Sequence, residues 1–233
     1  MLELQDVHTY YGESHILQGV SLKVPKGSIV ALLGRNGMGK TTTIHSIMGF
    51  IPSKSGKIEF RGSPIVGLPS YKIAQAGIAL IPQSKRIFPS LTVEENIAIG
   101  QKKSISLTPD ENLSRVSELF PALKRKSDHR GNELSGGEQQ MLSFARALAT
   151  NPDLILMDEP FEGLAPAIVK DLSDCISRLK NQGLSILLVE QDIRAALNLA
   201  DYVYIMGNGR IIYEGKPEQL QADESVLKSL LAV

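Results

Sequence analysis

The chain of 233 residues is 42% hydrophobic, which is enough for one large domain, or a domain with a subdomain, around a buried core. Its 25 basic and 25 acidic residues give a formal net charge of zero, which argues against a nucleic-acid-binding protein that works through a large basic surface. A single cysteine, Cys175, excludes a disulfide within the chain and a Cys-based metal site, so we expect a reduced, cytosolic setting.

Residues 1–24 predict two strands and no targeting segment. Residues 1–6 lack the basic and apolar regions of a signal peptide, and the apolar runs of the chain fall far short of the ~20 residues that span a bilayer. Apolar side chains recur every two or three residues in 2–7 and alternate with polar ones in 20–24, which is typical of half-exposed antiparallel strands. Between them lies Tyr10–Tyr11–Gly12, where an aromatic ring either stacks on a nucleotide base or packs on its strand.

A glycine-rich stretch follows the next predicted strand. Residues 28–33 form a short, apolar, β-branched run typical of a buried strand, and residues 41–48 predict a helix that ends at Gly49. The stretch between them fits the phosphate-loop pattern G-x-x-x-x-G-K-[ST] and comprises Gly34, Arg35, Asn36, Gly37, Met38, Gly39, Lys40, Thr41 and Thr42.

This loop has the chemistry of a nucleotide site. Its glycines let successive backbone N–H groups line an anion-binding concavity at the positive end of the following helix. Lys40 supplies a charge for the β- and γ-phosphates, and Thr41 supplies a hydroxyl for Mg²⁺. We therefore predict that the chain binds a nucleotide here.

Two further strands are expected before the middle of the chain. Residues 55–62 read as a strand bounded by turn residues, and Ile78–Ile81 is an apolar strand that ends at Pro82–Gln83. The side-chain amide of Gln83 either contacts Mg²⁺ or a water, or belongs to an ordinary loop.

From residue 91 to residue 150 the sequence predicts a helical subdomain inserted between two parts of an α/β core. Thr92 and Glu95 have the spacing of a helix capping box, and Pro109–Asp110–Glu111 suits the first turn of another helix. Apolar residues that suggest helices follow through this segment: Ile97, Leu113, Val116, Leu119 and Phe120.

A second helix start rich in glycine lies near the end of this segment. It comprises Leu134, Ser135, Gly136, Gly137, Glu138 and Gln139, in which Ser135 and Glu138 form a capping box. Glycines in the first turn leave the N–H groups bare, which favours a second anion site, although a cap without a ligand is the alternative. Met141, Ala145 and Leu148 predict a buried stripe on the helix that follows.

The buried-strand run 154–157 ends in two carboxylates, Asp158 and Glu159. Because successive strand side chains point to opposite faces, we expect the two groups to do different work at the mouth of a parallel sheet. Asp158 suits the Mg²⁺ shell, and Glu159 suits orienting or deprotonating a water, a role worth about 10²–10⁴ in rate. An acidic strand end without a catalytic role is the alternative.

The last part of the chain predicts one more buried strand and a hairpin. Residues 185–189 form the strand, which ends in Glu190–Gln191–Asp192, and Asn208–Gly209 predicts a type I′ turn between two strands. Residues 217–233 suggest one or two short helices. Cys175 shares a helical face with Ile168, Leu172 and Leu179, so we expect a buried structural thiol.

These elements, in this order along essentially the whole chain, resemble the nucleotide-binding subunits of ABC transporters. Residues 134–139 match the signature that distinguishes this family from other phosphate-loop ATPases, and residues 34–41 and 154–159 match its nucleotide motifs. The resemblance implies an α/β fold, with a P-loop NTPase (RecA-like) core, an N-terminal antiparallel β-subdomain and an inserted α-helical subdomain that carries the signature. Within a single ATP-binding domain, 1–233, we place the core with its β-subdomain at 1–87 and 151–233 and the helical subdomain at 88–150.

The resemblance also implies roles for individual residues. Tyr11 is expected to stack on adenine, Gln83 to reach Mg²⁺ and sense the membrane partner, and Glu159 to act as the catalytic base. Gln191 stands where most members carry a histidine that contacts the γ-phosphate, and a neutral amide cannot carry the charge of an imidazolium. We therefore expect Gln191 to be a modest geometric aid to catalysis.

Three segments are similar to the branched-chain amino-acid importer subgroup of this family: residues 86–96, 162–166 and 189–191. Gln83 departs from the glutamate often seen in that subgroup, and residues 34–40 are similar to the related urea and amide importers. The resemblance thus implies ATP-driven import of a small solute, with branched-chain amino acids as the first expectation and urea or amides as the second.

The family resemblance implies that ATP and Mg²⁺ are bound between two subunits paired head to tail. Each ATP is held by the phosphate loop of one subunit and capped by the signature of the other, which is an identical copy or a related paralogue. Integral permease subunits are the expected membrane partners, and a periplasmic or extracellular solute-binding protein acts indirectly. The chain is expected at the cytoplasmic face of the inner membrane as a peripheral subunit, with no nucleic-acid partner.

Two non-transport classes fit the sequence less well. Soluble ABC ATPases of DNA repair carry a coiled coil or zinc-binding insertion between phosphate loop and signature, whereas residues 83–135 are a short stretch without cysteine. ABC factors of translation usually join two cassettes, and this sequence shows one. Another transporter branch, such as lipopolysaccharide or metal export, is the nearer alternative.

Overall fold

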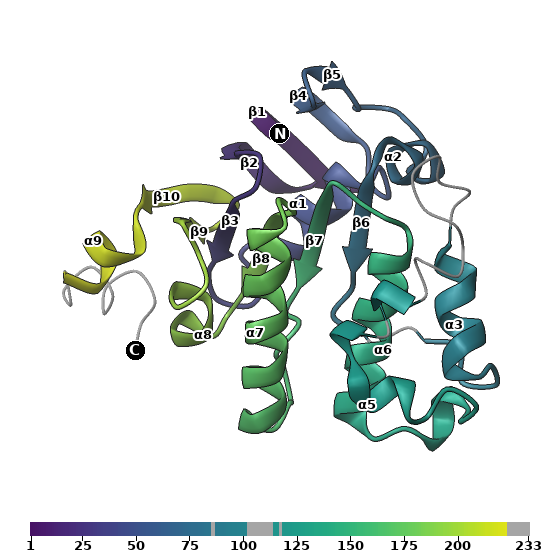
Figure 1. Ribbon diagram of the computed structural model, residues 1–233. Helices are drawn as coiled ribbons and strands as arrows, with labels where there is room; N and C mark the ends of the chain where they lie inside the picture. Colours follow the sequence, from purple (N-terminus) through teal and green to yellow (C-terminus); the bar gives the residue numbers. More distant parts are fainter. Residues whose placement is uncertain (85–86, 102–113, 117, 223–233) are drawn as a thin grey trace.

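The computed structural model describes residues 1–84, 87–101, 114–116 and 118–222, and within them the strands form two sheets (Figure 1). The larger sheet has the strand order β10-β9-β3-β8-β7-β6. Strands β9, β3, β8, β7 and β6 run parallel, and β10 is antiparallel to β9. The bounds are Ile29–Leu33 (β3), Ile78–Ile81 (β6), Leu154–Asp158 (β7), Ser185–Glu190 (β8), Tyr202–Gly207 (β9) and Arg210–Gly215 (β10). The carboxyl ends of the parallel strands therefore meet at one edge of this sheet, where ligands of such folds bind.

The smaller sheet is antiparallel and is built mainly from the N-terminal part of the chain. Its order is β2-β1-β4-β5, with the bounds Leu2–Tyr11 (β1), Ser14–Val24 (β2), Ser53–Phe60 (β4) and Ser63–Pro64 (β5). All of its pairings are antiparallel, as the alternation in residues 20–24 predicted. The predicted N-terminal β-subdomain is therefore confirmed.

Alternation along the larger sheet divides the core into two clusters. In β3, Ile29, Ala31 and Leu33 face one cluster, while Val30 and Leu32 face the other. The first cluster lies against α6 (Gly136–Ala149) and α7 (Pro166–Asn181), and the second lies against α1 (Lys40–Ile47) and the antiparallel sheet. Burial on both faces explains why these strands appear in the sequence as continuous apolar runs.

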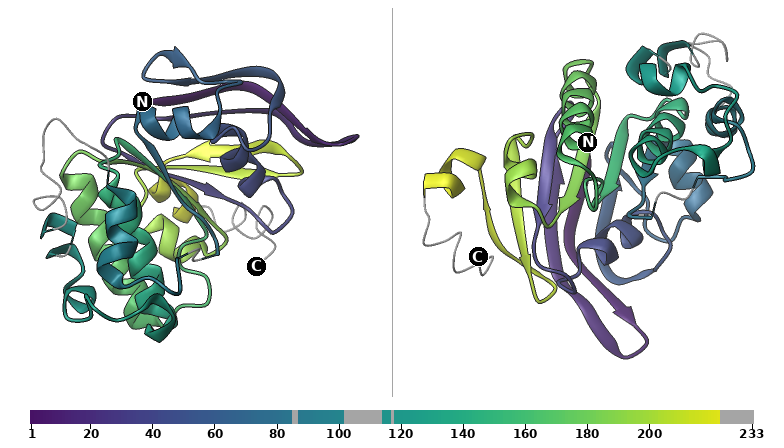
Figure 2. Two further views of the ribbon diagram at one scale, coloured as in Figure 1. Left: turned by 90° about the vertical axis from the view of Figure 1, so that its right-hand side faces the viewer. Right: turned by 90° about the horizontal axis from the view of Figure 1, so that it is seen from below.

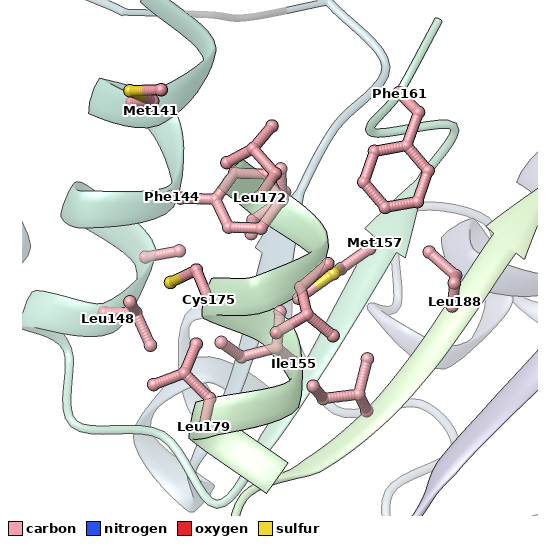
Figure 3. Packing of buried hydrophobic residues seen from close by; sticks show 14 of the residues in the cluster. Met141, Phe144, Leu148, Ile155, Met157, Phe161, Leu172, Cys175, Leu179 and Leu188 are labelled. Atoms are coloured by element: carbon pink, nitrogen blue, oxygen red, sulfur yellow. The ribbon is translucent and has the colours of Figure 1, made fainter. Parts of the chain in front are cut away.

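The helices α6 and α7 pack side by side over β7 (Figure 3). Met141 and Phe144 of α6 and Leu172 and Cys175 of α7 belong to the same buried cluster. Cys175 is a free cysteine, and burial raises the pKa of its thiol to about 11. The prediction of a buried structural thiol is confirmed, because an uncharged thiol at neutral pH is a poor nucleophile.

Helices gather at both ends of the larger sheet (Figure 2). Beyond β6 lie α3 (Val93–Gly100) and α5 (Pro121–Lys124), while α9 (Pro217–Ala222) follows β10. Other elements of the described residues are α2 (Ser70–Ala76), the 3-10 turn Gly131–Glu133 and α8 (Ile193–Leu197). The helix start expected at 109–111, the apolar residue Leu113 and the tail beyond 222 lie outside the described residues.

Several local predictions agree with the structure. Thr92 and Glu95 form the expected capping box at the start of α3. Asn208 and Gly209 both have positive φ, 46° and 77°, as a type I′ turn requires. Within the described part of the chain, no helix has both the length and the apolar character that crossing a bilayer demands.

Candidate functional site

The phosphate loop connects β3 to α1 and is packed closely against the rest of the core. A Cβ at Gly34 would lie 2.6 Å from the carbonyl oxygen of Met206 in β9, so only glycine fits there. Gly39 adopts φ 106°, a conformation that side chains disfavour, and no side chain caps the helix that begins at Lys40. The N–H groups of the first turn of α1 are therefore left for an anion.

The β9–β10 turn braces this loop from outside. Gly209 N donates to the carbonyl of Met38 at 3.0 Å, and Gln18 N in turn donates to the carbonyl of Gly209 at 2.8 Å. Asn208 N contacts the sulfur of Met38 at 3.2 Å. The loop thus keeps its shape through contacts with both sheets, while Arg35 and Asn36 remain exposed.

Lys40 lies at the centre of the site. Its side chain is buried, and Nζ donates to the carbonyl oxygens of Gly34 at 2.8 Å and Arg35 at 3.2 Å. Nζ also lies 3.0 Å from Glu159 Oε1, and both side chains of this ion pair are less than a tenth exposed. A buried ammonium is tolerated here because oxygens surround it.

Thr41 and Asp158, which the sequence predicts to bind Mg²⁺, are in direct contact. Thr41 Oγ1 donates to Asp158 Oδ1 at 3.2 Å across the gap between α1 and β7. Burial raises the pKa of Asp158 to about 6, and the charge of Glu159 adds to this, whereas the hydrogen bond from Thr41 and the charge of Lys40 lower it. A cation placed beside Asp158 would favour its ionised form.

The donor set at this point suits Mg²⁺. Mg²⁺ is usually bound by one or two carboxylates together with hydroxyl, water and phosphate oxygens rather than by a cage of many protein ligands. Thr41 and Asp158 supply one hydroxyl and one carboxylate. Among the residues that the structure describes, no group of three or more His, Cys, Asp or Glu could hold a metal, so the phosphates would have to complete the shell.

Glu159 is placed differently from what strand alternation predicted. Strand β7 ends at Asp158, and Glu159 has φ 48°, in the left-handed region that non-glycine residues rarely adopt. Its N–H donates to the carbonyl of Val189 in β8 at 2.8 Å. Asp158 contacts Thr41, and Glu159 contacts the preceding residue, Lys40. The two carboxylates therefore differ in the residue that each contacts, and not because they point to opposite faces of a strand.

Gln83 lies near the carboxylates but does not contact Asp158 in the structure. Its Nε2 donates to Glu162 Oε2 at 2.9 Å and to Glu159 Oε2 at 3.5 Å. Gln191 follows β8 and is exposed, and its backbone N donates to Glu190 Oε2 at 3.2 Å. Gln83 and Gln191 therefore both follow strands that end at the same sheet edge as Asp158 and Glu159.

The tyrosine pair at the β1–β2 turn separates into two environments. The Tyr10 ring stacks on His15 with centroids 4.1 Å apart, and Lys54 Nζ lies 4.7 Å from its centre. The Tyr11 side chain is 48% exposed, so its ring is free to stack on a ligand. The structure therefore shows which of the two rings is accessible to a ligand, a distinction that spacing in the sequence could not make.

The signature segment forms the start of α6. Ser135 Oγ accepts from Glu138 N at 3.4 Å and Glu138 Oε2 accepts from Ser135 N at 2.9 Å, which confirms the capping box. Gly137 lies so close to α7 that a Cβ would be 2.9 Å from Ile168 Cγ1. Gln139 Nε2 donates to the carbonyl of Leu134 at 3.3 Å.

Lys126 lies beside this helix start, with Nζ 2.7 Å from Glu138 Oε1, and this hydrogen bond lowers the pKa of Glu138. Among the described residues, no hydrogen bond or ion pair joins residues 134–139 to residues 34–42. Phosphate loop and signature are therefore separate features of this one chain.

Sequence reasoning assigned no role to Glu190 or Gln140. Glu190 is 3% exposed at the end of β8, and Gln140 Nε2 donates to the carbonyl of Pro160 at 3.1 Å. The sequence does contain a signal for Glu190, because this charged residue ends an apolar strand, as Asp158 and Glu159 end the run 154–157. The sequence gives no comparable indication for Gln140, because the residue that it contacts, Pro160, is distant in sequence.

Comparisons with known proteins identify the family of this chain. A family model described as ABC transporter matches residues 17–162. The chain is 44% identical over 212 residues to the high-affinity branched-chain amino acid transport ATP-binding protein BraG of Pseudomonas aeruginosa, and the match covers 91% of each chain. It is 39% identical over 233 residues to the lipopolysaccharide export system ATP-binding protein LptB of Haemophilus influenzae, covering 99% of this chain and 97% of LptB.

Solved structures of the same kind share the fold. A nucleotide-free ATP-binding cassette from an ABC transporter gives a TM-score of 0.88 at 30% identity, covering 100% of this chain and 98% of the cassette. A dimeric bacterial ABC transporter cassette gives 0.82 at 25% identity, covering 93% and 99%. The chain therefore belongs to the ABC transporter family as an ATP-binding subunit, and it is an ATPase.

Proposed function

We propose that this ATPase powers the import of branched-chain amino acids through a membrane permease. The observation that carries the ATPase mechanism is the convergence of Lys40, Thr41, Asp158 and Glu159 at the carboxyl ends of β3 and β7. The choice of solute rests on the 44% identity to BraG and on the subgroup pattern in residues 162–166.

ATP would be held mainly by the phosphate loop. Residues 34–42 offer backbone N–H groups to the phosphates, Lys40 offers its charge, and Tyr11 offers an exposed ring to adenine. Thr41, Asp158 and Gln83 would hold Mg²⁺, which when bound neutralises charge on the phosphates. Gln83 would have to leave Glu162 to take this part.

Glu159 is proposed as the base for the attacking water. As the water oxygen bonds to the γ-phosphorus and the bond to the bridging oxygen of ADP breaks, the water proton passes to the carboxylate, and the products are ADP and phosphate. Lys40 now neutralises this carboxylate, and phosphate oxygens would compete for Lys40 Nζ. ATP binding itself would therefore release Glu159 for its role, with Gln191 as a neutral aid near the γ-phosphate.

A second subunit would complete each site. The start of α6 presents Ser135 and the N–H groups of a glycine-containing first turn, yet in the described part of the chain it makes no bond to its own phosphate loop. We infer a head-to-tail pair in which residues 134–139 of one subunit cap the ATP of the other, and the similar cassette solved as a dimer supports this. The partner is an identical copy or a paralogue.

A groove beside α3 offers a docking site for the permease. It has a volume of about 570 Å³, and Phe88, Ile99 and Arg146 are among its lining residues. Phe88 and Ile99 are 44% and 54% exposed, and Arg146 lies over the Phe88 ring at 5.1 Å. Because Phe88 follows the Gln83 segment in the chain, a cytoplasmic permease loop bound here would respond to changes at the ATP site.

We propose that the subunit lies at the cytoplasmic face of the inner membrane, bound to permease subunits that receive solute from a binding protein on the other side. Residues 88–150 would act as the helical subdomain and residues 1–87 and 151–233 as the core. Purification of the tagged chain from solubilised membranes, with mass spectrometry of the bound proteins, tests the partner. Integral permease subunits are expected, and ribosomes or DNA as the main partners would contradict the proposal.

The solute is tested by uptake of labelled leucine. Cells that lack the gene should lose uptake, wild-type protein should restore it, and Glu159→Gln should not. Import of urea or amides is the alternative within the same subgroup, and labelled urea in the same cells tests it. Unchanged leucine uptake in cells that lack the gene would contradict branched-chain amino-acid import.

Lipopolysaccharide export is the second candidate, because the match to LptB spans 99% of this chain at 39% identity. Depletion of the protein separates the two functions. Loss of leucine uptake with normal lipopolysaccharide at the cell surface supports import, and accumulation of lipopolysaccharide inside the cell with normal uptake supports export.

A further inference from the structure

Glu190 is a buried carboxylate that the mechanism above does not use. Its side chain is 3% exposed, and carboxylates are rarely buried to this degree without strong partners. The partners here are backbone amides: Oε1 accepts from Phe161 N at 3.1 Å, and Oε2 accepts from Gln191 N at 3.2 Å. Both carboxylate oxygens therefore accept hydrogen bonds from the backbone.

The two segments that Glu190 holds are those that carry the proposed catalytic side chains. Phe161 lies in the turn that begins at Glu159, and Gln191 begins the loop after β8. Glu159 adopts φ 48°, which a non-glycine residue keeps only where its surroundings fix it. The hydrogen bond from Phe161 to Glu190 fixes the turn just beyond this residue.

The same turn is held from the opposite side by the signature helix. Gln140 Nε2 of α6 donates to the carbonyl of Pro160 at 3.1 Å, so the Pro160–Phe161 peptide group is bonded at both its oxygen and its nitrogen. The Phe161 ring is 6% exposed and lies beside the ends of β7 and β8, near Met157 (Figure 3). The turn is therefore anchored by packing as well as by hydrogen bonds.

We propose that Glu190 is a positioning residue for ATP hydrolysis, which sets Glu159 and Gln191 relative to each other by holding the turn after β7 and the loop after β8. This inference rests on the proposed role of Glu159. Both hydrogen bonds are strongest with an ionised carboxylate, in which both oxygens only accept, whereas a glutamine would present an NH₂ donor to one of the two N–H donors. A neutral isostere would keep the packing and lose one of the two connections.

The surroundings of Glu190 make its charge sensitive to pH. Burial raises the pKa of Glu190 to about 7, the backbone hydrogen bonds lower it, and the charge of Glu159 raises it further. The carboxyl groups of Glu159, Glu162 and Asp192 line the same pocket. Protonation of Glu190 near neutral pH would therefore weaken the connection, which gives the hydrolysis rate a dependence on this group.

The test uses the full chain with Glu190→Gln and compares kcat, KM for ATP, the Kd for a fluorescent ATP analogue and the pH profile from 6 to 9. We expect kcat to fall by about 10- to 100-fold, as small misplacement of catalytic groups does, with the Kd changed less than about twofold. The rise of kcat between pH 6 and 8 should also become shallower. A wild-type kcat with an unchanged pH profile would overturn the inference.

Ser185→Ala is the matched control, because Ser185 begins the same strand and its Oγ accepts from a backbone N–H, that of Gly27, at 2.9 Å. This variant should lose stability but keep kcat and the pH profile, and an equal loss of kcat would show that Glu190 acts through stability alone. Glu190→Asp keeps the charge but shortens the side chain, and it tests the positioning role if Glu190→Gln does not fold. Reduced kcat with an unchanged Kd supports positioning, and wild-type kcat contradicts it.

Glu159→Gln, measured in parallel, separates this inference from the proposed function. If Glu159→Gln keeps turnover, the proposed base is wrong. If Glu159→Gln loses turnover while Glu190→Gln keeps it, only the positioning role fails.

Discussion

Lys40 Nζ lies 3.0 Å from Glu159 Oε1, and both side chains are buried, so the cation of the phosphate loop neutralises the carboxylate that follows β7. Removing either partner would leave an uncompensated charge out of water, which typically costs about 3–5 kcal/mol. Lys40 and Glu159 are therefore expected to stabilise the folded subunit without nucleotide, in addition to their proposed roles in binding and hydrolysing ATP.

A double-mutant cycle measures this link. Lys40→Met and Glu159→Gln should each change the free energy of unfolding, and the double variant should differ from their sum by about 1–3 kcal/mol, because the two groups contact each other directly. Urea unfolding at pH 7.5 without nucleotide gives the values.

The surface pair Lys23–Glu3, at 2.9 Å and with side chains 68% and 31% exposed, is the control for that cycle. Its coupling should stay below about 1 kcal/mol, since water screens both groups. Equal coupling in the two cycles would mean that the buried pair contributes no more than a surface ion pair.

Glu159→Gln should abolish ATP hydrolysis while ATP binding survives and dimers accumulate. The amide cannot take a proton from water, but Lys40 and the backbone N–H groups that are proposed to bind the phosphates are retained. Turnover is measured by phosphate release, binding by a fluorescent ATP analogue and dimers by size-exclusion chromatography with light scattering.

Glu162→Gln is the neighbouring control for this experiment, because Glu162 also bonds Gln83 but is exposed. It should keep most of the activity. Loss of binding in Glu159→Gln equal to its loss of turnover would refute the assignment of Glu159 as the base.

Features that depend on residues close in sequence could be predicted. The strand, loop and helix around Lys40, the capping box of Ser135 and Glu138, and the Asn208–Gly209 turn all occur as expected. In each case the residues that determine the backbone conformation are close together in sequence and contact one another. The local sequence pattern is therefore enough to predict the conformation.

Contacts between distant segments could not be predicted. The Lys40–Glu159 pair, the Gln83–Glu162 hydrogen bond and the bond from Phe161 to Glu190 depend on how separate strands align. Strand alternation was also a poor guide to Glu159, because the strand ends one residue earlier and the backbone turns into the left-handed region. The sequence could therefore name candidate residues, but it could not predict the partners that these residues contact in the structure.

The stability contributed by Glu190 should fall as the pH rises. Its folded pKa of about 7 lies above the ordinary 4.5, so between these values the folded chain keeps a proton that the unfolded chain has released, and unfolding becomes easier with increasing pH. A shift of this size corresponds to at most about 3 kcal/mol, fully lost above pH 7.

Glu190→Gln does not titrate, so its free energy of unfolding relative to wild type should rise from pH 5 to pH 8 by up to this amount. Urea unfolding at several pH values measures the difference. For Ser185→Ala the difference from wild type should not depend on pH. A difference independent of pH for Glu190→Gln as well would mean that Glu190 is ionised throughout.

Tyr11→Ala should weaken ATP binding by about 1–3 kcal/mol, the usual contribution of an aromatic ring stacked on a base. Tyr11→Phe should bind ATP as wild type does, because the ring remains. Isothermal titration calorimetry gives the affinities, with Tyr71→Ala, an exposed tyrosine on α2, as a control that should change nothing. Equal affinity for Tyr11→Ala and wild type would show that adenine lies elsewhere.

The most direct measurement is a crystal structure of Glu159→Gln with ATP and Mg²⁺. If backbone amides at the starts of α1 and α6 from two subunits hold one triphosphate, the partner subunit's Ser135 will lie within hydrogen-bond distance, ~3 Å, of the γ-phosphate bound by Lys40. A structure in which ATP occupies the phosphate loop while no neighbouring Ser135 approaches it would contradict this arrangement.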